Sequence, residues 1–246
     1  MLIGISGRSQ ITNGIVAGMI SGELIMRNSQ LRRGELQIRR FGDKLKDMIC
    51  VLTGCTRAEL ENDSFRVSNM PPEWNRWMVH YDNGQIHDAK GSEWFCTYDE
   101  AEAFRMRTLG KPYSKFDYYV KEHPITYQMM LQEVGVDLLR NKFHPDTLVN
   151  ALFYEWHPIA TESRHWMGHA ITMEDEPVKY PTWIIADVCY NNEMARIKKY
   201  HGVVIRINEP GESKYDGFDA VIDNNGTLEA LRIKVTDTVN KLNLKV

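Results

Sequence analysis

The stretch Met1-Leu-Ile-Gly-Ile-Ser-Gly7 opens the chain as an apolar run of strand length that ends in glycine. The polar residues 8–13 follow, and they are interpreted as a turn. After them, apolar residues recur at the spacing of one helix face: Ile15, Val16, Met19, Ile20 and Leu24. Strand, glycine turn and helix in this order predict the opening unit of a nucleotide-binding α/β fold.

The rest of the chain repeats this alternation of strands and helices. Short apolar runs predict strands at 37–41, 183–188, 202–207 and 220–222. Helical spacing predicts helices at 43–52, 98–107, 126–140, 191–200 and 227–242, with another beginning near 144–146. Residues 157–180 are interpreted as a loop, and 61–123 as an irregular excursion from the sheet. The pattern predicts one α/β domain over 1–246, with a mainly parallel sheet and helices on both faces.

Composition narrows the class of protein. The 246 residues are 43% hydrophobic and 26% charged, which is typical of a globular chain. A net charge of −3 argues against a general nucleic-acid binder, which usually carries a basic excess. The four cysteines have no zinc-binding spacing, and no run approaches the roughly 20 apolar residues of a membrane span. We therefore expect a cytoplasmic protein with reduced thiols and no membrane partner.

In an open parallel sheet, ligands bind where loops leave the carboxyl ends of the strands. Four segments are expected there: 7–14, 187–190, 206–217 and 223–226. The first is compared with the phosphate loop G-x-x-x-x-G-K-[ST]. Gly7 matches, but the sequence then has Thr12, Asn13 and Gly14 where the motif requires glycine, lysine and a hydroxyl residue.

Several segments together resemble one family. They are Phe41-Gly-Asp-Lys-Leu-Lys46, Met70-Pro-Pro-Glu-Trp74, Leu131-Gln-Glu-Val-Gly-Val-Asp-Leu-Leu-Arg140, His144-Pro-Asp146, Asp187-Val-Cys-Tyr-Asn-Asn-Glu193, Gly202-Val-Val-Ile-Arg206 and Asp219-Ala-Val-Ile-Asp-Asn-Asn-Gly-Thr-Leu-Glu-Ala-Leu231. In this order and spacing they resemble the phage deoxynucleoside monophosphate kinases, members of the P-loop kinase superfamily. The likeness spans most of the chain and thins between 75 and 125. It implies a three-layer fold with about five parallel strands.

The resemblance also implies a site. The substrate nucleotide would bind near 41–46, and ATP with Mg²⁺ between the first loop and 223–226. The chain departs from the family at its charged positions. Asn13 replaces the loop lysine, Cys189 and Gln128 stand where arginines are expected, and the lid is reduced to 208–216. Because such cations neutralise the transferred phosphoryl group, these losses together predict impaired transfer.

The candidate site residues fall into three groups. The catalytic candidates are Arg8, Arg140 and Asp187. The ATP-side candidates are Gly7, Arg8, Ser9, Thr12, Asn13, Gly14, Arg206, Asn224 and Gly226. The substrate-side candidates are Asp43, Lys44, Gln128 and Arg140.

Structural alternatives stay open for several of these residues. Asp187 is a magnesium-side carboxylate or a cap for the next helix, and Arg140 a phosphate ligand or a surface arginine. Asp43 and Lys44 fit a solvated helix start equally well. The pair His165 and His169 has i,i+4 spacing but no carboxylate partner, so no protein metal site is predicted.

Three functions remain. The first is a nucleotide-binding protein derived from a kinase, a pseudoenzyme that binds ATP or a deoxynucleoside monophosphate. The alternative is an active kinase whose charge comes from Arg8, Arg140 or Arg206. The third is an assembly protein that has lost the nucleotide site. A homodimer is compatible with each, and whether 61–123 forms its contact stays open.

Overall fold

The structure is a computed structural model that describes residues 1–28, 34–81, 95–109, 118–159, 165–166, 169–170, 178–212 and 217–244. The chain divides into two compact units. Residues 1–45 and 138–246 form the first, which we call the sheet unit, and residues 46–137 form the second unit. The irregular stretch 61–123 lies in the second unit. Whether the two units make one domain stays a prediction.

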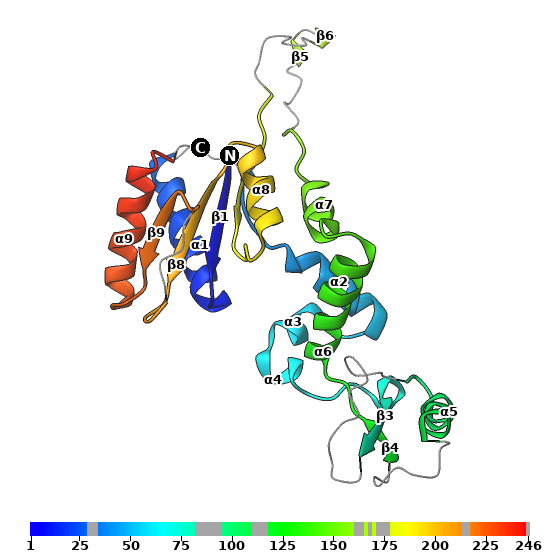
Figure 1. Cartoon of the computed structure of the whole chain (residues 1–246). Helices are drawn as coiled ribbons and strands as arrows, with labels where there is room; N and C mark the ends of the chain where they lie inside the picture. The colour runs from blue at the N-terminus through cyan, green and yellow to red at the C-terminus, as the bar shows by residue number, and fades with distance from the viewer. Residues whose placement is uncertain are drawn as a thin grey trace. The chain divides into compact units, whose positions relative to one another are not determined.

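The sheet unit contains five parallel strands (Figure 1). In spatial order they are β2 (Leu36–Arg39), β7 (Thr182–Ile185), β1 (Leu2–Gly7), β8 (Val203–Asn208) and β9 (Ala220–Asp223). The central strand β1 pairs with both neighbours, so that Ile3 lies beside Ile184 on one side and Val203 on the other. These strands follow the apolar runs of the sequence, and the predicted parallel α/β sheet is confirmed.

Helices cover both faces of this sheet. On one face, α1 (Gln10–Arg27) and α9 (Leu228–Lys241) pack on a buried core that includes Ile5, Val16 and Val235. On the other face, α7 (Thr147–Phe153) and α8 (Asn191–Lys199) pack on a second core that includes Leu152 and Ile197. The three-layer arrangement that the sequence predicted is therefore present.

Two helix starts differ from the prediction. Residues 8–13 are not a turn, because α1 begins at Gln10 with Ser9 as its N-cap. The helix after residue 144 begins only at Thr147, and Pro145 precedes it. The predicted helix 126–140 starts as expected after the N-cap Thr126, as α6 (Tyr127–Gln132). It then continues as a π-helix, η2 (Glu133–Phe143), a form that is rare at this length.

The helix α2 (Gly42–Thr53) begins in the sheet unit and ends in the second unit, where Gly54 has a positive φ of 76°. The second unit further contains α3 (Arg57–Glu61), α4 (Asp63–Arg66), η1 (Pro72–Trp74), β3 (Arg76–Tyr81), α5 (Tyr98–Leu109) and β4 (Tyr118–His123). Strands β3 and β4 pair in antiparallel fashion. The helix predicted at 98–107 is confirmed by α5.

Within the predicted loop 157–180, the structure describes one short antiparallel pair, β5 (His165–Trp166) and β6 (His169–Ala170). Among the described residues, no helix has both the length and the apolar character required to cross a bilayer.

Candidate functional site

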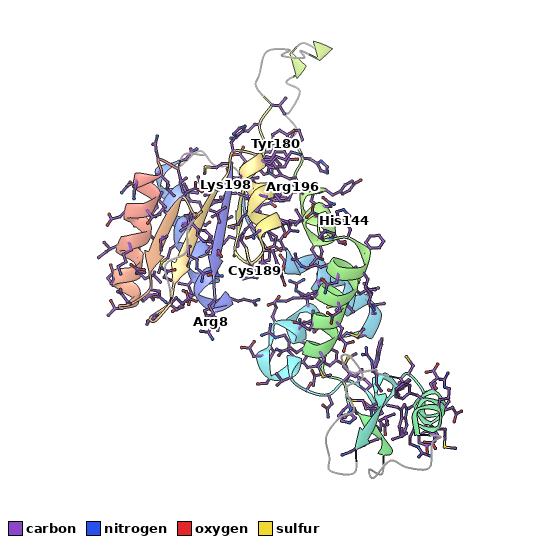
Figure 2. All side chains as sticks on the ribbon, viewed as in Figure 1. Arg8, His144, Tyr180, Cys189, Arg196 and Lys198 are labelled. Carbon is purple, nitrogen blue, oxygen red and sulfur yellow. The ribbon has the colours of Figure 1, made fainter. Side chains whose placement is uncertain are left out.

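The candidate site lies at the carboxyl edge of the parallel sheet, where β1, β2, β7, β8 and β9 all end. Figure 2 shows Arg8 and Cys189 at this end of the sheet unit. Most of the predicted site residues belong to this edge. Gln128 does not, because it lies on α6 in the second unit, where it is exposed.

The connection between β1 and α1 is short. Gly7 ends β1, and only Arg8 and Ser9 separate it from Gln10, the first residue of α1. Thr12, Asn13 and Gly14 therefore belong to the first turns of the helix. A phosphate loop needs an extended run of backbone N–H groups between its strand and helix, to wrap the phosphate oxygens. The expected loop over 7–14 is not formed.

Asn13, which stands where the family has lysine, closes this turn. Its side chain is 1% exposed, and Nδ2 donates to the carbonyl of Gly7 at 3.1 Å. Its Oδ1 lies 2.3 Å from the position that a Cβ on Gly7 would occupy. This oxygen is buried and has no hydrogen-bond partner among the described residues. The residue at position 13 thus fills the turn from inside instead of reaching out to a ligand.

Ser9 has a local role, because its Oγ accepts from the Thr12 N–H at 3.2 Å and caps α1. Arg8 is exposed beside this helix start. A second cation that the sequence reading missed is Arg40, which follows β2. Its Nη2 lies 3.4 Å from where a Cβ on Gly14 would be, so it packs against the first turns of α1. Its position near the carboxyl end of the strand predicted at 37–41 was the signal that could have found it.

Asp187 is a helix cap, but not of the next helix, as the sequence suggested. Its Oδ1 accepts from the Phe41 N–H at 2.8 Å, and its Oδ2 from the Gly42 N–H at 2.9 Å, at the start of α2. Burial raises the pKa of Asp187 from 3.8 to about 6, and the carboxylates of Glu193 and Asp43 add to the rise. The two backbone hydrogen bonds oppose it. Both carboxylate oxygens are therefore committed to the backbone.

Arg140 pairs with Glu193 on α8. The side chains of the two residues are 10% and 1% exposed, and the Arg140 guanidinium also lies 3.7 Å from the centre of the Tyr190 ring. Glu193 further accepts from the backbone N–H groups of Cys189 at 2.8 Å and Tyr190 at 3.1 Å. Arg140 is thus not a surface arginine. It neutralises a buried carboxylate that fixes the start of α8.

Arg206, on β8, is held in a similar way. Its Nη1 donates to Ser6 Oγ at 3.2 Å, and its Nη2 pairs with Glu212 at 3.0 Å. The side chains of Arg206 and Glu212 are 12% and 10% exposed. Glu212 also accepts from the Glu209 N–H at 3.1 Å, so the pair fixes the chain that leaves β8.

The ends of β8 and β9 are also joined to one another. Asn224 donates its side-chain amide to Glu209 at 3.1 Å, and its backbone N–H to the carbonyl of Asn208 at 2.8 Å. A Cβ on Gly226 would lie 3.2 Å from the Cβ of Ala230, in the first turn of α9. Of the predicted ATP-side residues, Asn224 therefore joins the end of β9 to the end of β8, and Gly226 lies close to the first turn of α9.

The substrate-side residues at the start of α2 show the same pattern. Asp43 accepts from the Arg40 N–H at 3.1 Å. Lys44 pairs with Glu155, which also accepts from Arg39. The two cations hold the pKa of Glu155 below its ordinary value. Lys44 is therefore ion-paired with Glu155, while 32% of its own side chain and 36% of that of Glu155 stay exposed.

Cys189 lies among these groups. Cys189 is exposed, but partial desolvation of its thiol and the carboxylates of Glu193 and Asp187 raise its pKa from 9.0 to about 11, against the opposing effect of Arg140 and Arg206. Where the family has an arginine, this chain therefore has a neutral thiol. Nucleophilic chemistry is disfavoured there, because the reactive form of cysteine is the thiolate.

Several cations of this edge are already paired within the chain. Arg140, Lys44 and Arg206 are engaged by internal carboxylates, while Arg8 and Arg40 lie beside the positive end of α1. In the part of the chain that the structure describes, no group of three or more His, Cys, Asp or Glu could hold a metal ion. Each oxygen of Asp187 already accepts one backbone hydrogen bond.

Comparison of the sequence with protein-family models found no match, and neither did comparison with curated proteins.

Proposed function

We propose that this chain is a nucleotide-binding protein of the deoxynucleoside monophosphate kinase type that does not transfer phosphoryl groups. The observation that carries the proposal is the two-residue turn between β1 and α1, closed from inside by the hydrogen bond of Asn13 to Gly7. A turn of this length cannot wrap the phosphates of ATP. Without the loop and its lysine, the charge neutralisation on which transfer depends is missing.

The ion pairs at the site support the same conclusion. An arginine acts in phosphoryl transfer by approaching the phosphate, where it is worth about 10³-fold or more in rate. Arg140 and Arg206 would each have to leave a buried carboxylate to do so. Leaving a buried charge unpaired costs about 3–5 kcal/mol, which offsets most of that gain. The alternative of an active kinase is therefore reduced to the single exposed candidate Arg8.

Binding of a nucleotide is supported by what remains. Arg8 and Arg40 flank the start of α1, a helix of 18 residues, and its backbone dipole favours an anion at this end. Two arginines and a helix start suit one phosphate group better than the triphosphate of ATP. We therefore expect a nucleoside monophosphate to bind more tightly than ATP.

The test is titration calorimetry of the full chain with ATP and with each deoxynucleoside monophosphate, in the presence of magnesium, followed by a coupled turnover assay. We expect micromolar binding of at least one monophosphate and no turnover. Arg8→Ala and Arg40→Ala should each weaken that binding roughly tenfold, or by about 1.4 kcal/mol. The matched control is Lys199→Ala, which removes an exposed cation at the C-terminal end of α8 and should leave binding unchanged.

The variant Asn13→Lys tests whether the short turn, and not only the missing lysine, prevents transfer. If the turn is too short for a phosphate loop, restoring the lysine alone creates no turnover. Turnover at ordinary kinase rates by the unmodified chain would refute the proposal and favour the active kinase. If neither ATP nor any deoxynucleoside monophosphate binds, the proposal is also refuted, and an assembly protein without a nucleotide site is favoured.

A further inference from the structure

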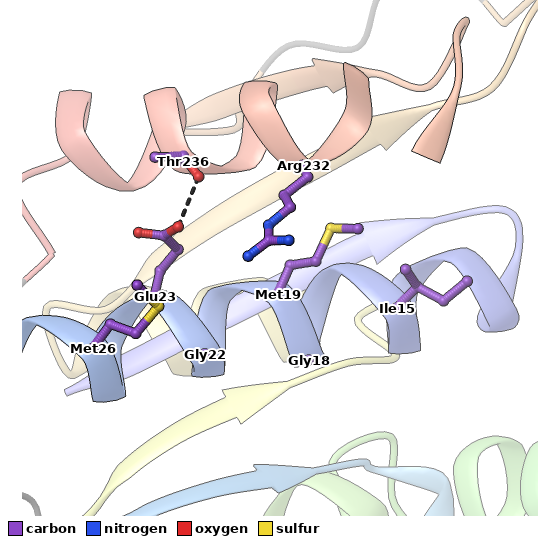
Figure 3. Close-up of a pocket in the computed structure, with 8 residues that line it drawn as sticks. All are labelled: Ile15, Gly18, Met19, Gly22, Glu23, Met26, Arg232 and Thr236. Carbon is purple, nitrogen blue, oxygen red and sulfur yellow. Dashed lines mark hydrogen bonds between the residues drawn. The ribbon is translucent and has the colours of Figure 1, made fainter. Parts of the chain in front are cut away.

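The outer surface of the α1 and α9 layer carries a groove that the candidate site does not use. Its volume is about 380 Å³, and Figure 3 shows the two helices that line it. The lining residues are Ile15, Gly18, Met19, Gly22, Glu23, Met26, Arg232 and Thr236. All of them belong to the sheet unit.

The floor of the groove contains two glycines in the middle of α1. A Cβ added at Gly18 or Gly22 would meet nothing within 4 Å, so neither glycine is needed for packing inside the sheet unit. Each costs a helix about 1 kcal/mol relative to alanine. Their four-residue spacing leaves a smooth strip along the helix, against which another helix can pack closely.

Large apolar side chains flank this strip and are exposed. Ile11 is 71% exposed, Ile15 42%, Ile25 52% and Met26 75%. On the opposite side of α1, Val16, Ile20 and Leu24 are buried in the core. The helix is therefore apolar on two faces, and only one of them is covered. A helix that is apolar all round is normally buried on all sides.

The charges of the groove indicate what covers it. It contains one acid, Glu23, and one base, Arg232. Thr236 donates to Glu23 at 2.9 Å, and Arg27 lies 3.4 Å from the same side chain. Arg232 is exposed and lies across the groove from Met19 (Figure 3). A partner surface of a single charge sign would attract one of these two residues and repel the other. A surface that carries an acid and a base of its own can attract both.

We propose that this groove is the contact between two copies of the chain. Around a two-fold axis between Gly18 and Gly22, the two α1 helices run antiparallel, and Gly18 of one copy faces Gly22 of the other. Glu23 of one copy then falls opposite the turn that contains Met19 in the second copy, where Arg232 lies. The contact is self-complementary, as a two-fold interface must be. It buries the exposed isoleucines and forms two symmetric ion pairs.

The test is sedimentation velocity of the full chain without nucleotide over a range of concentrations, so its result does not depend on the proposed function. We expect a reversible dimer. Gly22→Leu places a large side chain on the glycine strip. Arg232→Glu places an acid opposite Glu23 of the other copy at both ion-pair positions. Each should weaken dimerisation at least tenfold while circular dichroism stays unchanged. The double variant Glu23→Arg with Arg232→Glu restores opposite charges and should recover the dimer.

The matched control is Val51→Asp, which places a charge at another exposed apolar position, on α2, and should leave the dimer intact. A monomer at every concentration would overturn the proposal. A dimer that withstands both Gly22→Leu and Arg232→Glu would also overturn it, because its contact would then lie elsewhere. Failure of the double variant to dimerise, with the single variants also monomeric, would rule out the proposed ion pair.

Discussion

Asn13 Nδ2 donates to the carbonyl oxygen of Gly7 at 3.1 Å, and the same side chain occupies the space beside Gly7 that a Cβ would need. The two residues therefore fit each other: glycine at 7 leaves room, and asparagine at 13 fills it. Since position 13 holds lysine in the family that the sequence resembles, this contact stands where a phosphate ligand is expected. Its energetic coupling can be measured.

The first prediction concerns this pair. Gly7→Ala should destabilise the chain by about 1–3 kcal/mol, because its new Cβ would lie 2.3 Å from Asn13 Oδ1, which is enclosed by the core. Asn13→Ala removes the clash, so the double variant should lose clearly less than the sum of the two single losses. Urea denaturation of the four proteins measures the coupling.

Gly14→Ala is the matched control on the same helix. Its nearest neighbour, Arg40 Nη2, lies at an ordinary contact distance of 3.4 Å. Replacing a helical glycine there should raise stability by up to about 1 kcal/mol. Additive losses in the pair of Gly7 and Asn13 would mean that the turn relaxes and that the two residues do not depend on each other.

The strands were predictable, because each is a short apolar run. Leu2 to Ser6, Trp183 to Ile185 and Val204 to Ile205 are buried on both faces of the sheet, and the alternation with helices indicates their parallel order. The start of α1 was not predictable from polarity. Residues 8–13 look like a turn, but Ser9 caps the helix and Asn13, in the first turns of the helix, is buried.

The site was less predictable than the fold, because its contacts join residues far apart in the sequence. Asp187 caps a helix that begins 145 residues earlier, at Gly42. Glu155 pairs with Arg39 and Lys44 from a position over 100 residues away. No local pattern marks such partners. The sequence therefore located the carboxyl edge correctly, but not which of its charges are already neutralised.

The second prediction concerns pH and Asp187, whose pKa is raised from 3.8 to about 6 by burial. Between these two values the folded chain binds this proton more tightly than the unfolded chain. The contribution of Asp187 to stability is thus fully present below about pH 4 and is lost as the pH rises through 6. A shift of this size corresponds to about 2–3 kcal/mol.

Asp187→Asn isolates this contribution, because asparagine cannot titrate and other groups cancel in the comparison. The free energy of unfolding of the original chain minus that of the variant should fall by about 2–3 kcal/mol between pH 4 and pH 7. Urea denaturation at four pH values across this range measures it. A difference that is independent of pH, or that grows with pH, would contradict the raised pKa.

The third prediction decides the role of Arg140. If it neutralises Glu193, whose side chain is 1% exposed, then Arg140→Met should destabilise the chain by about 3–5 kcal/mol by leaving that carboxylate unpaired. Glu193→Gln keeps an acceptor for the N–H groups of Cys189 and Tyr190 but removes the charge. Adding it to Arg140→Met should therefore recover part of the lost stability.

A phosphate ligand behaves in the opposite way. If Arg140 served a nucleotide, Arg140→Met would weaken nucleotide binding with little change in the unliganded chain, and Glu193→Gln would not compensate. Thermal denaturation without ligand and calorimetry with a deoxynucleoside monophosphate, on the same three variants, separate the two roles. We expect Arg140→Met to lower the stability of the unliganded chain and Glu193→Gln to recover part of it. The reason is that the guanidinium is already enclosed between a buried carboxylate and the Tyr190 ring.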